Sequence, residues 1–467
     1  MTILPRNSAE TGWLADCIYT GGAFEPGLAM FADSSGRITR FSRDARDLAK
    51  AQRLAGRAIL PGLVNGHSHA FQRVIRGRTE HRTRASQDTF WTWRKSMYHA
   101  ANLLSPEAMC QAARMAFLEM VLSGITTVGE FHYIHHAPGG GAYADRNLLA
   151  ERVVRAARDV GLRIALLRTA YVRAGWNKPP DPLQARFLTP RVDDFISDTE
   201  ALRSAVASSY APDRAWVAVA PHSLRAVPLD YLGEVIRYAR ANDLPVHMHV
   251  AEQPAEVEAC RAEYGRRPIE LLDQHGLLDP RFTAIHAIHI TGDEIACLGR
   301  AGVAVCACPT TERNLGDGML PADRLLAAGV RIALGSDSNV QINLLEDGRS
   351  LEYHLRMHQL QRAVLNDPLA QRLLACATES GSECLAAPGG ALEAGRAADF
   401  FTVDLNDPSI AGAGPQSLVT HIVFSLERTA IRDVCVGGEF VVRDGRHPLG
   451  EEIVRQFGAM QRALWGE

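Results

Sequence analysis

The stretch Ala58-Ile59-Leu60-Pro61-Gly62-Leu63-Val64-Asn65-Gly66-His67-Ser68-His69 places two histidines directly after an apolar run. A short apolar run bounded by turn residues is typical of a buried β-strand. Alternate side chains of a strand lie on one face, so His67 and His69 point the same way, as two ligands of one metal ion must. A His-x-His pair alone is weak evidence, because most histidines lie at the surface or form hydrogen bonds in the core. The rest of the chain decides whether this pair binds metal.

Similar apolar runs recur along the chain and are mostly separated by amphipathic, helix-like stretches. The eight runs begin near Ile59, Gly124, Arg163, Trp216, Pro245, Thr283, Val303 and Arg331. Runs rich in Val, Ile, Leu and Ala suit parallel strands that are covered on both faces. Eight of them favour a closed, TIM-like (β/α)8 barrel over an open sheet, and we predict this catalytic domain over residues 59–392.

The two ends of the chain carry strand-like runs outside this pattern. They lie at 17–22 and 28–33 before the barrel and at 399–403 and 432–436 after it. Turn residues bound these runs, as expected of short strands. We therefore predict a small β-sandwich domain built from both ends, its first part being residues 1–58 and its second part, with a C-terminal helix, residues 393–467.

Composition excludes several classes of protein. The chain has 467 residues, of which 46% are hydrophobic and 22% charged, and a formal net charge of −3. No long basic run is present, so a nucleic-acid partner is not expected. No apolar segment approaches the roughly 20 residues that span a bilayer, and the first residues lack a signal-peptide pattern. We expect a cytoplasmic protein without membrane contact, with its nine cysteines reduced. A homodimer is the default expectation for such an enzyme.

Polar side chains follow several of the predicted strands. His67 and His69 end the first strand, His249 ends the fifth, and Asp337 follows the eighth. In a barrel of this kind the active site is built at the carboxyl ends of the strands. Three neutral imidazoles and one carboxylate suit Zn²⁺, which takes ligands at about 2 Å. We predict that these four residues hold one zinc ion per chain.

Three residues beside this predicted ion are candidates for catalysis. A bound Zn²⁺ lowers the pKa of a water molecule from 15.7 to roughly 7, which makes a nucleophile available at neutral pH. Glu252, three residues after His249, is predicted to move a proton from this water to the substrate nitrogen. His286, on the sixth strand, would orient the water, and Asp337 would accept a proton later in the reaction. Hydrolysis at a C=N or C–N carbon follows from this set.

These residues together resemble the amidohydrolase superfamily, in its mononuclear deaminase-like branch. There a His-x-His pair, a His-x-x-Glu on strand five, a His on strand six and an Asp on strand eight recur. Binuclear members of the superfamily bridge two metal ions through a carboxylated lysine after strand four. The lysines of this chain are Lys50, Lys95 and Lys178, and none follows that strand. The resemblance therefore implies one metal ion per chain.

Loops near the predicted barrel mouth carry cations and neutral donors. These candidate substrate-binding residues are Gln72, Arg94, Tyr133, His222 and Arg225. Arginine can bind a carboxylate through two hydrogen bonds. Two arginines in matching loops favour a small acidic substrate, although each alone could form a structural ion pair.

The same loops make the resemblance more specific. His-Ser-His-Ala-Phe-Gln-Arg (67–73), Phe-Trp-Thr-Trp-Arg (90–94), Ala-Pro-His-Ser-Leu-Arg (220–225) and Cys-Pro-Thr-Thr-Glu-Arg-Asn-Leu-Gly-Asp-Gly (308–318) are similar to the formimidoylglutamate deiminase family. That family hydrolyses N-formimino-L-glutamate to N-formyl-L-glutamate and ammonia, and the resemblance implies the metal and substrate residues given above. One departure is Asn339, where the family pattern has His.

Three alternatives remain open at this point. One is a related deaminase or chlorohydrolase acting on a nucleobase-like or triazine ring, with Trp91 and Trp93 forming an aromatic slot. Another is a deiminase of a different formimino amino acid, such as formiminoaspartate. The third is a non-catalytic barrel that has lost its metal, against which the intact ligand set and Glu252 weigh.

Overall fold

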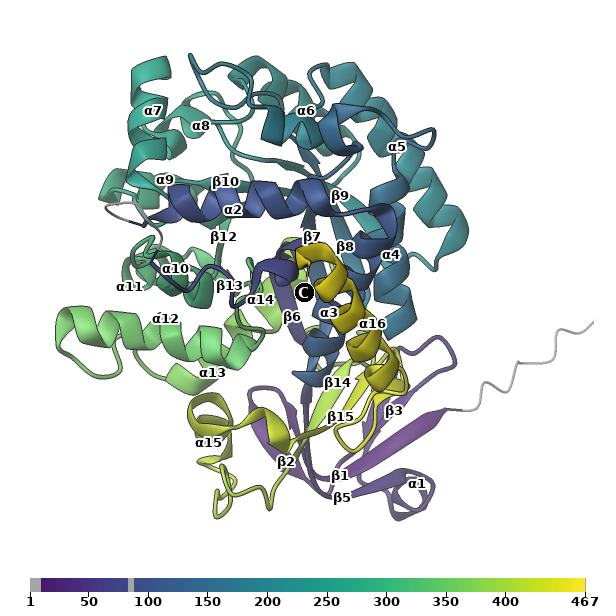
Figure 1. The fold of residues 1–467 in the computed structure, drawn as a ribbon. Coiled ribbons are helices and arrows are strands. Elements are labelled where there is room, and N and C mark those ends of the chain that lie inside the picture. Colours follow the sequence, from purple (N-terminus) through teal and green to yellow (C-terminus); the bar gives the residue numbers. More distant parts are fainter. Residues whose placement is uncertain (1–9, 83–87, 467) are drawn as a thin grey trace, which may run out of the picture.

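The protein folds into an eight-stranded parallel barrel with a second sheet made from the two ends of the chain (Figure 1). The computed structural model describes residues 10–82 and 88–466. The barrel strands are β6 (Leu63–Ser68), β7 (Ile125–His132), β8 (Arg163–Ala170), β9 (Ala215–Pro221), β10 (Val246–Val250), β11 (Phe282–His286), β12 (Ala304–Ala307) and β13 (Arg331–Leu334). The end sheet contains β1 (Thr11–Thr20), β2 (Ala23–Pro26), β3 (Ala29–Ala32), β4 (Ile38–Ser42), β5 (Gln52–Pro61), β14 (Phe400–Asp404), β15 (Ile431–Val436) and β16 (Glu439–Val442).

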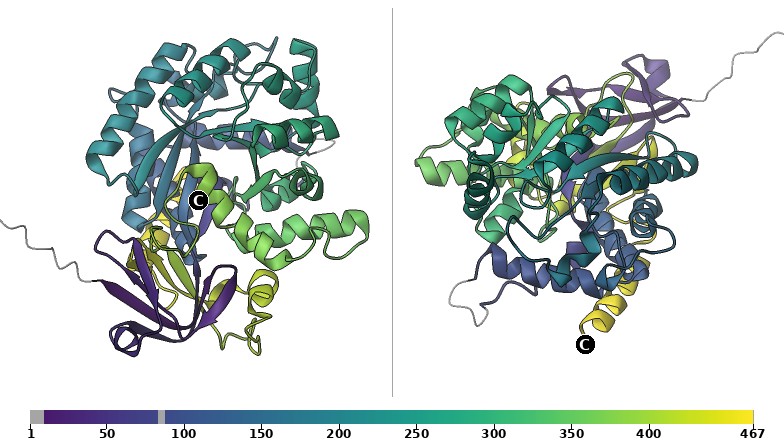
Figure 2. Two further views of the ribbon diagram at one scale, coloured as in Figure 1. Left: turned by 180° about the vertical axis from the view of Figure 1, so that it is seen from behind. Right: turned by 90° about the horizontal axis from the view of Figure 1, so that it is seen from above.

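Most helices surround the barrel and cover its strands, whereas α1 lies beside the end sheet (Figures 1 and 2). They are α1 (Ala45–Leu48), α2 (Phe90–Leu103), α3 (Pro106–Leu122), α4 (Leu148–Val160), α5 (Val192–Ser209), α6 (Leu229–Ala241), α7 (Pro254–Tyr264), α8 (Pro268–Gln274), α9 (Gly292–Ala301), α10 (Pro309–Leu315), α11 (Ala322–Ala327), α12 (Leu344–Gln359), α13 (Leu369–Cys376), α14 (Glu379–Leu385), α15 (Leu418–Ser425) and α16 (Gly450–Trp465). Short 3₁₀ helices are η1 (Ala70–Ile75), η2 (Pro138–Gly140), η3 (Pro182–Phe187) and η4 (Arg428–Ala430). None of these helices is long and apolar enough to cross a membrane.

The predicted fold class is confirmed, and seven of the eight expected strands begin within one residue of the predicted start. The exception is the first run, which the structure divides between the two sheets. Residues up to Pro61 belong to β5 of the end sheet, and the barrel strand β6 begins at Leu63. Gly62 separates the two strands, and a β-carbon there would lie only 2.3 Å from Thr126 Oγ1. The chain therefore passes from one sheet to the other at a point with no room for a side chain.

The barrel closes where its first and last strands meet. Ser68 and Asp337 form a parallel β-bridge. Asp337 N–H donates to the His67 carbonyl at 3.0 Å, and His69 N–H donates to the Asp337 carbonyl at 2.9 Å. Asp337 adopts a left-handed backbone conformation, with φ of 44°. This seam sets the side chains after β6 and β13 side by side.

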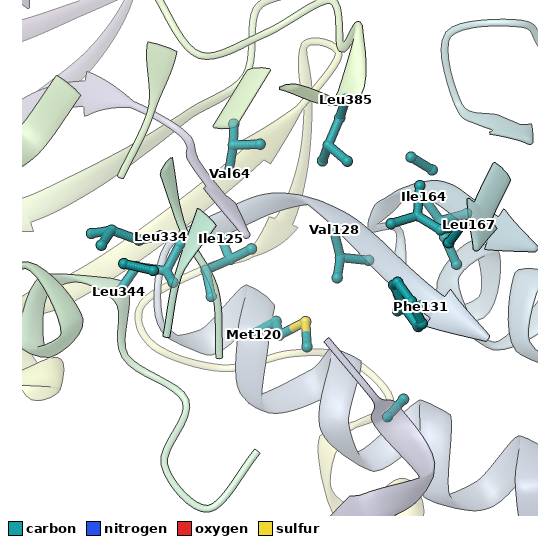
Figure 3. Close-up of a cluster of buried hydrophobic side chains, with 14 of the residues drawn as sticks. Val64, Met120, Ile125, Val128, Phe131, Ile164, Leu167, Leu334, Leu344 and Leu385 are labelled. Carbon is teal, nitrogen blue, oxygen red and sulfur yellow. The ribbon is translucent and has the colours of Figure 1, made fainter. Parts of the chain in front are cut away.

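The main core lies between the barrel strands and the surrounding helices. Figure 3 shows part of this cluster, with side chains from β6, β7, β8 and β13 together with side chains from α3, α12 and α14. The strand residues are buried on both faces, as the near-continuous apolar runs predict. A rigid, fully packed barrel fixes the positions of the strand ends that carry the polar groups.

The end sheet joins the two termini of the chain. β5 and β14 pair in antiparallel fashion, with Ile59 opposite Thr402. The sheet has its own apolar core, which includes Trp13, Met30 and Phe400. The predicted C-terminal helix is α16, and it lies along α3 (Figure 1), where Arg114 donates to Gln456 at 2.8 Å.

Candidate metal centre

Four side chains from distant parts of the chain meet at the carboxyl end of the barrel. His67, His69, His249 and Asp337 each offer one ligand atom, and these atoms all lie within 4.8 Å of one another. All four residues are buried. They come from β6 and the residue after it, from β10, and from the turn after β13. The geometry brings together the four residues that the sequence nominated as metal ligands.

The separations of the donor atoms match those of a tetrahedral site. His67 Nε2 lies 3.2 Å from His249 Nε2 and 3.4 Å from Asp337 Oδ1. His69 Nε2 lies 3.3 Å from Asp337 Oδ1. Ligand distances of about 2.0–2.1 Å around a tetrahedral Zn²⁺ give donor–donor separations of roughly 3.3 Å. These residues therefore fit a single divalent ion.

Hydrogen bonds on the far side of two rings fix the donor nitrogens. His69 Nδ1 lies 2.9 Å from the Phe131 carbonyl, and His249 Nδ1 lies 3.0 Å from the His222 carbonyl. A carbonyl can only accept, so each Nδ1 carries the proton and each Nε2 presents a lone pair to the cluster. Such backbone acceptors are the usual partners of metal-ligating histidines.

Burial keeps these rings neutral. It lowers the pKa of His67 to about 3, and it places the pKa of His249 well below its usual value. Burial raises the pKa of Asp337, but hydrogen bonding and charge interaction with His67 outweigh it, so the net pKa of this carboxyl is lowered. Neutral imidazoles and an ionised carboxylate are the protonation states that metal binding requires.

Two further polar groups lie beside the cluster. His286 ends β11, and its Nε2 lies 3.7 Å from Glu252 Oε1 and 3.8 Å from Asp337 Oδ2. Burial raises the pKa of Glu252 to about 7, even though His286 lowers it. A carboxyl group with a pKa near neutrality can both accept and release a proton at physiological pH. The structure thus places Glu252 and His286, both predicted from the sequence to act in catalysis, next to the metal ligands.

A small cavity of about 40 Å³ opens onto the cluster. Its walls include three residues of the metal cluster, the side chains of Glu252 and His286, and several apolar side chains. All five residues predicted to bind substrate line it, namely Gln72, Arg94, Tyr133, His222 and Arg225. They come from η1, α2 and the loops after β7 and β9. Residues that sequence reasoning did not nominate also line it, among them Phe90, Met97 and Leu315.

Among the described residues, the two arginines of the cavity form no ion pair with an acidic side chain. No carboxylate oxygen of the described residues lies within 4.0 Å of a guanidinium nitrogen of Arg94 or Arg225. The Nη1 atom of each arginine is buried and has no hydrogen-bond partner. Burial lowers the pKa of Arg94, and the charge of Arg225 lowers it further. Gln72 donates to Tyr133 Oη at 3.1 Å, while its own Oε1 has no partner. A partly buried pair of cations that makes no direct ion pair is suited to an anionic ligand.

Asn339, which departs from the expected pattern, has a structural place at the barrel seam. Its Nδ2 donates to the His69 carbonyl at 3.0 Å and to Ser68 Oγ at 3.2 Å. Its Oδ1 accepts from Ser336 Oγ at 2.7 Å. Asn339 therefore braces the strand ends that carry the metal ligands, and its side chain makes these contacts without joining the cluster.

Comparison with known proteins identifies the family of this chain. Residues 58–441 match the sequence model of the amidohydrolase family. The chain belongs to the amidohydrolase family. It is 40% identical to the formimidoylglutamate deiminase of Pseudomonas aeruginosa over 415 residues, which are 87% of this chain and 89% of that protein. The superfamily predicted from the sequence is thereby confirmed.

Two solved structures share the whole fold of this chain. The crystal structure of an amidohydrolase from Brucella melitensis superimposes on this chain with a TM-score of 0.90 at 33% identity. The superposition covers 97% of this chain and 100% of the Brucella chain. An adenosine deaminase from Xanthomonas campestris with bound zinc superimposes with a TM-score of 0.82 at 22% identity. This superposition covers 98% of this chain and 99% of the Xanthomonas chain. The likeness to the adenosine deaminase shows a shared fold and nothing more.

One polar residue in contact with the candidate site was missed by the sequence reasoning. Glu312, in α10, lies 3.2 Å from His286 Nδ1. Glu312 belongs to the motif at residues 308–318 that is similar to the deiminase family, but its spacing from His286 in the sequence does not indicate that the two side chains are in contact. A strand and a helix from different repeats bring the two together.

Proposed function

We propose that this chain hydrolyses the formimino group of N-formimino-L-glutamate to N-formyl-L-glutamate and ammonia. One cavity opens onto the four-residue metal cluster and is lined by two arginines, Arg94 and Arg225, that form no ion pair among the described residues, and this observation carries the proposal. The likeness to the Pseudomonas aeruginosa deiminase supports the same reaction. The substrate has two carboxylates and an amidine-like carbon, which are the groups that this cavity suits.

We propose that one Zn²⁺ per chain is held by His67, His69, His249 and Asp337. When bound, it would supply a hydroxide nucleophile at neutral pH by acidifying water. The donor set of three neutral imidazoles and one carboxylate supports zinc over calcium or magnesium, which prefer oxygen ligands.

The chain's own residues then have distinct tasks in the proposed reaction. Glu252 accepts a proton from the attacking water and donates it to the imino nitrogen, which becomes an amino group. His286 Nε2, 3.7 Å from Glu252, orients the same water. Asp337 accepts the remaining proton of the same oxygen as the carbonyl of the product forms, and this proton passes to the amino group, so that ammonia leaves as a neutral molecule.

The remaining polar groups of the cavity hold the substrate. Arg94 and Arg225 bind its two carboxylates through charge-assisted hydrogen bonds. Gln72, Tyr133 and His222 supply neutral hydrogen-bonding groups around them. Because the carboxylates are remote from the reacting carbon, this binding positions that carbon next to Glu252.

Ammonia release from a panel of substrates tests this function. The zinc-loaded chain is expected to act on N-formimino-L-glutamate with a kcat/KM at least about 100-fold above that for formiminoaspartate, guanine, cytosine or S-adenosylhomocysteine. Higher activity on a ring substrate would favour the nucleobase-type alternative, and higher activity on formiminoaspartate would change the amino acid. A metal content near zero with no activity would favour a non-catalytic barrel.

A further inference from the structure

Helix α10 places a buried carboxylate behind His286, on the side of the ring that faces away from Glu252. Glu312 lies in the first turn of this helix and is 1% exposed. Its Oε1 is 3.2 Å from His286 Nδ1 and accepts a hydrogen bond from Cys308 N–H at 2.9 Å. The second contact comes from the start of the same helix, so the carboxylate is held firmly in one position.

The two nitrogens of His286 therefore meet different groups. Nδ1 faces Glu312, whereas Nε2 faces Glu252 Oε1 at 3.7 Å and Asp337 Oδ2 at 3.8 Å. A carboxylate acceptor at Nδ1 fixes the proton on that nitrogen and sets the angle of the ring. His286 itself has a left-handed backbone with φ of 69°, which most residues avoid, so its place at the strand end is closely specified.

We propose that Glu312 is a positioning residue that acts through His286. Its hydrogen bond from Nδ1–H holds the imidazole with Nε2 toward the reacting water. Loss of this acceptor leaves the ring free to rotate or to adopt the other tautomer, either of which turns the wrong nitrogen toward the cavity. The inference rests on the proposed function for its kinetic consequences, but the ring orientation itself can be measured without substrate.

A purely structural role for Glu312 predicts a different outcome. Helix α10 is also anchored by Asp347, a fully buried residue whose Oδ1 accepts from Thr310 N–H at 3.0 Å. No hydrogen bond or ion pair among the described residues joins Asp347 to His286. The substitution Asp347→Leu removes an anchor of the same helix and is the matched control for Glu312→Leu.

The kinetic test compares Glu312→Leu, Glu312→Gln and Asp347→Leu as zinc-loaded proteins. Glu312→Leu is expected to lower kcat by about 10- to 100-fold, the usual effect of removing such a partner, with KM within threefold and metal content unchanged. Glu312→Gln keeps an oxygen that can accept from Nδ1–H and is expected to recover most of this loss. Asp347→Leu should keep kcat within threefold. Equal losses in the two leucine variants, or no rescue by glutamine, would overturn the proposal.

The second readout is the protonation pattern of His286 in ¹⁵N-histidine-labelled protein, with the resonance assigned by His286→Gln. The wild type and Glu312→Gln are expected to show a proton on Nδ1, and Glu312→Leu should shift or lose this signal. A wild-type proton on Nε2 alone would overturn the proposal. This measurement needs no turnover, so it separates a failure of the positioning role from a failure of the proposed substrate.

Discussion

Arg163 and Asp399 form a fully buried, two-point ion pair across 236 residues of sequence. Arg163 Nε lies 2.7 Å from Asp399 Oδ2, and Nη2 lies 3.0 Å from Oδ1. Arg163 begins the barrel strand β8, and Asp399 directly precedes β14 of the end sheet. Asp399 Oδ1 also accepts from Gly437 N–H at 2.6 Å. One carboxylate therefore ties the barrel to the sheet made by the chain ends.

Asp399→Asn is expected to destabilise the protein strongly. It removes the buried counter-charge of Arg163 and leaves only the partly exposed Asp213 carboxylate, 3.3 Å from Nη1, and removing one partner of a buried ion pair typically costs about 3–5 kcal/mol. Urea unfolding followed by circular dichroism measures the change. Asp273→Asn, which removes the exposed partner of Arg300 at 3.3 Å, is the control and should cost less than about 1 kcal/mol. Equal effects of the two variants would show that the buried pair does not join the two parts of the fold.

The sequence predicted the barrel because its strands are apolar on both faces and repeat eight times. It placed the boundary of the first strand less well, because residues 58–64 form one apolar run in the sequence. Only the tertiary structure shows that Pro61 ends a strand of one sheet and Leu63 begins a strand of another. Hydrophobic periodicity reports burial, and residues on both sides of Gly62 are buried, Leu60 and Leu63 in the main core and Ile59 in the core of the end sheet.

The candidate site was predictable where residues follow strands, since parallel strands in a barrel end on one face. His67, His249 and Asp337 were identified in this way. Glu312 was not, because it lies in the first turn of a helix and contacts a histidine 26 residues away in the sequence. Contacts of this kind depend on how a helix packs against a neighbouring strand, and no local pattern encodes that packing.

Glu252→Gln is expected to lower kcat by at least 10²- to 10⁴-fold with metal content unchanged. The amide has nearly the same shape as the carboxyl but cannot carry a proton between water and nitrogen, and general acid–base catalysis contributes a factor of this size. Steady-state ammonia release and metal analysis of the same preparation measure both quantities. Turnover near the wild-type level would remove Glu252 from the proposed mechanism.

The pH profile should report the ionisation of the same group. Burial raises the pKa of Glu252 from 4.5 to about 7, and a bound divalent cation lowers it from there. Glu252 must be ionised to accept a proton, so kcat/KM is expected to rise with pH along an acidic limb between about 4.5 and 7. The limb should be absent from the residual activity of Glu252→Gln. An unchanged limb in that variant would assign it to another group.

Arg225→Ala is expected to weaken use of the acidic substrate selectively. Removing a charge-assisted hydrogen bond of about 1.5–3 kcal/mol lowers kcat/KM by roughly 10- to 150-fold. An uncharged N-alkylformamidine has no carboxylate, so its kcat/KM should change by less than threefold in the same variant. A similar loss for both substrates would mean that Arg225 supports the fold of the cavity and does not bind a carboxylate.

Metal removal should affect both activity and stability. Because the four donor atoms meet only in the folded barrel, an ion that binds them stabilises the native state by about 2.7 kcal/mol at a free concentration 100 times its Kd. Chelation is therefore expected to abolish ammonia release and to lower Tm, with both restored by added Zn²⁺. His249→Ala should bind far less than one ion per chain and show no rise in Tm. His247→Gln is the matched control, since His247 lies on the same strand but contacts the Cys384 carbonyl at 3.0 Å, outside the cluster. Equal metal contents of the two variants would mean that His249 is not a ligand.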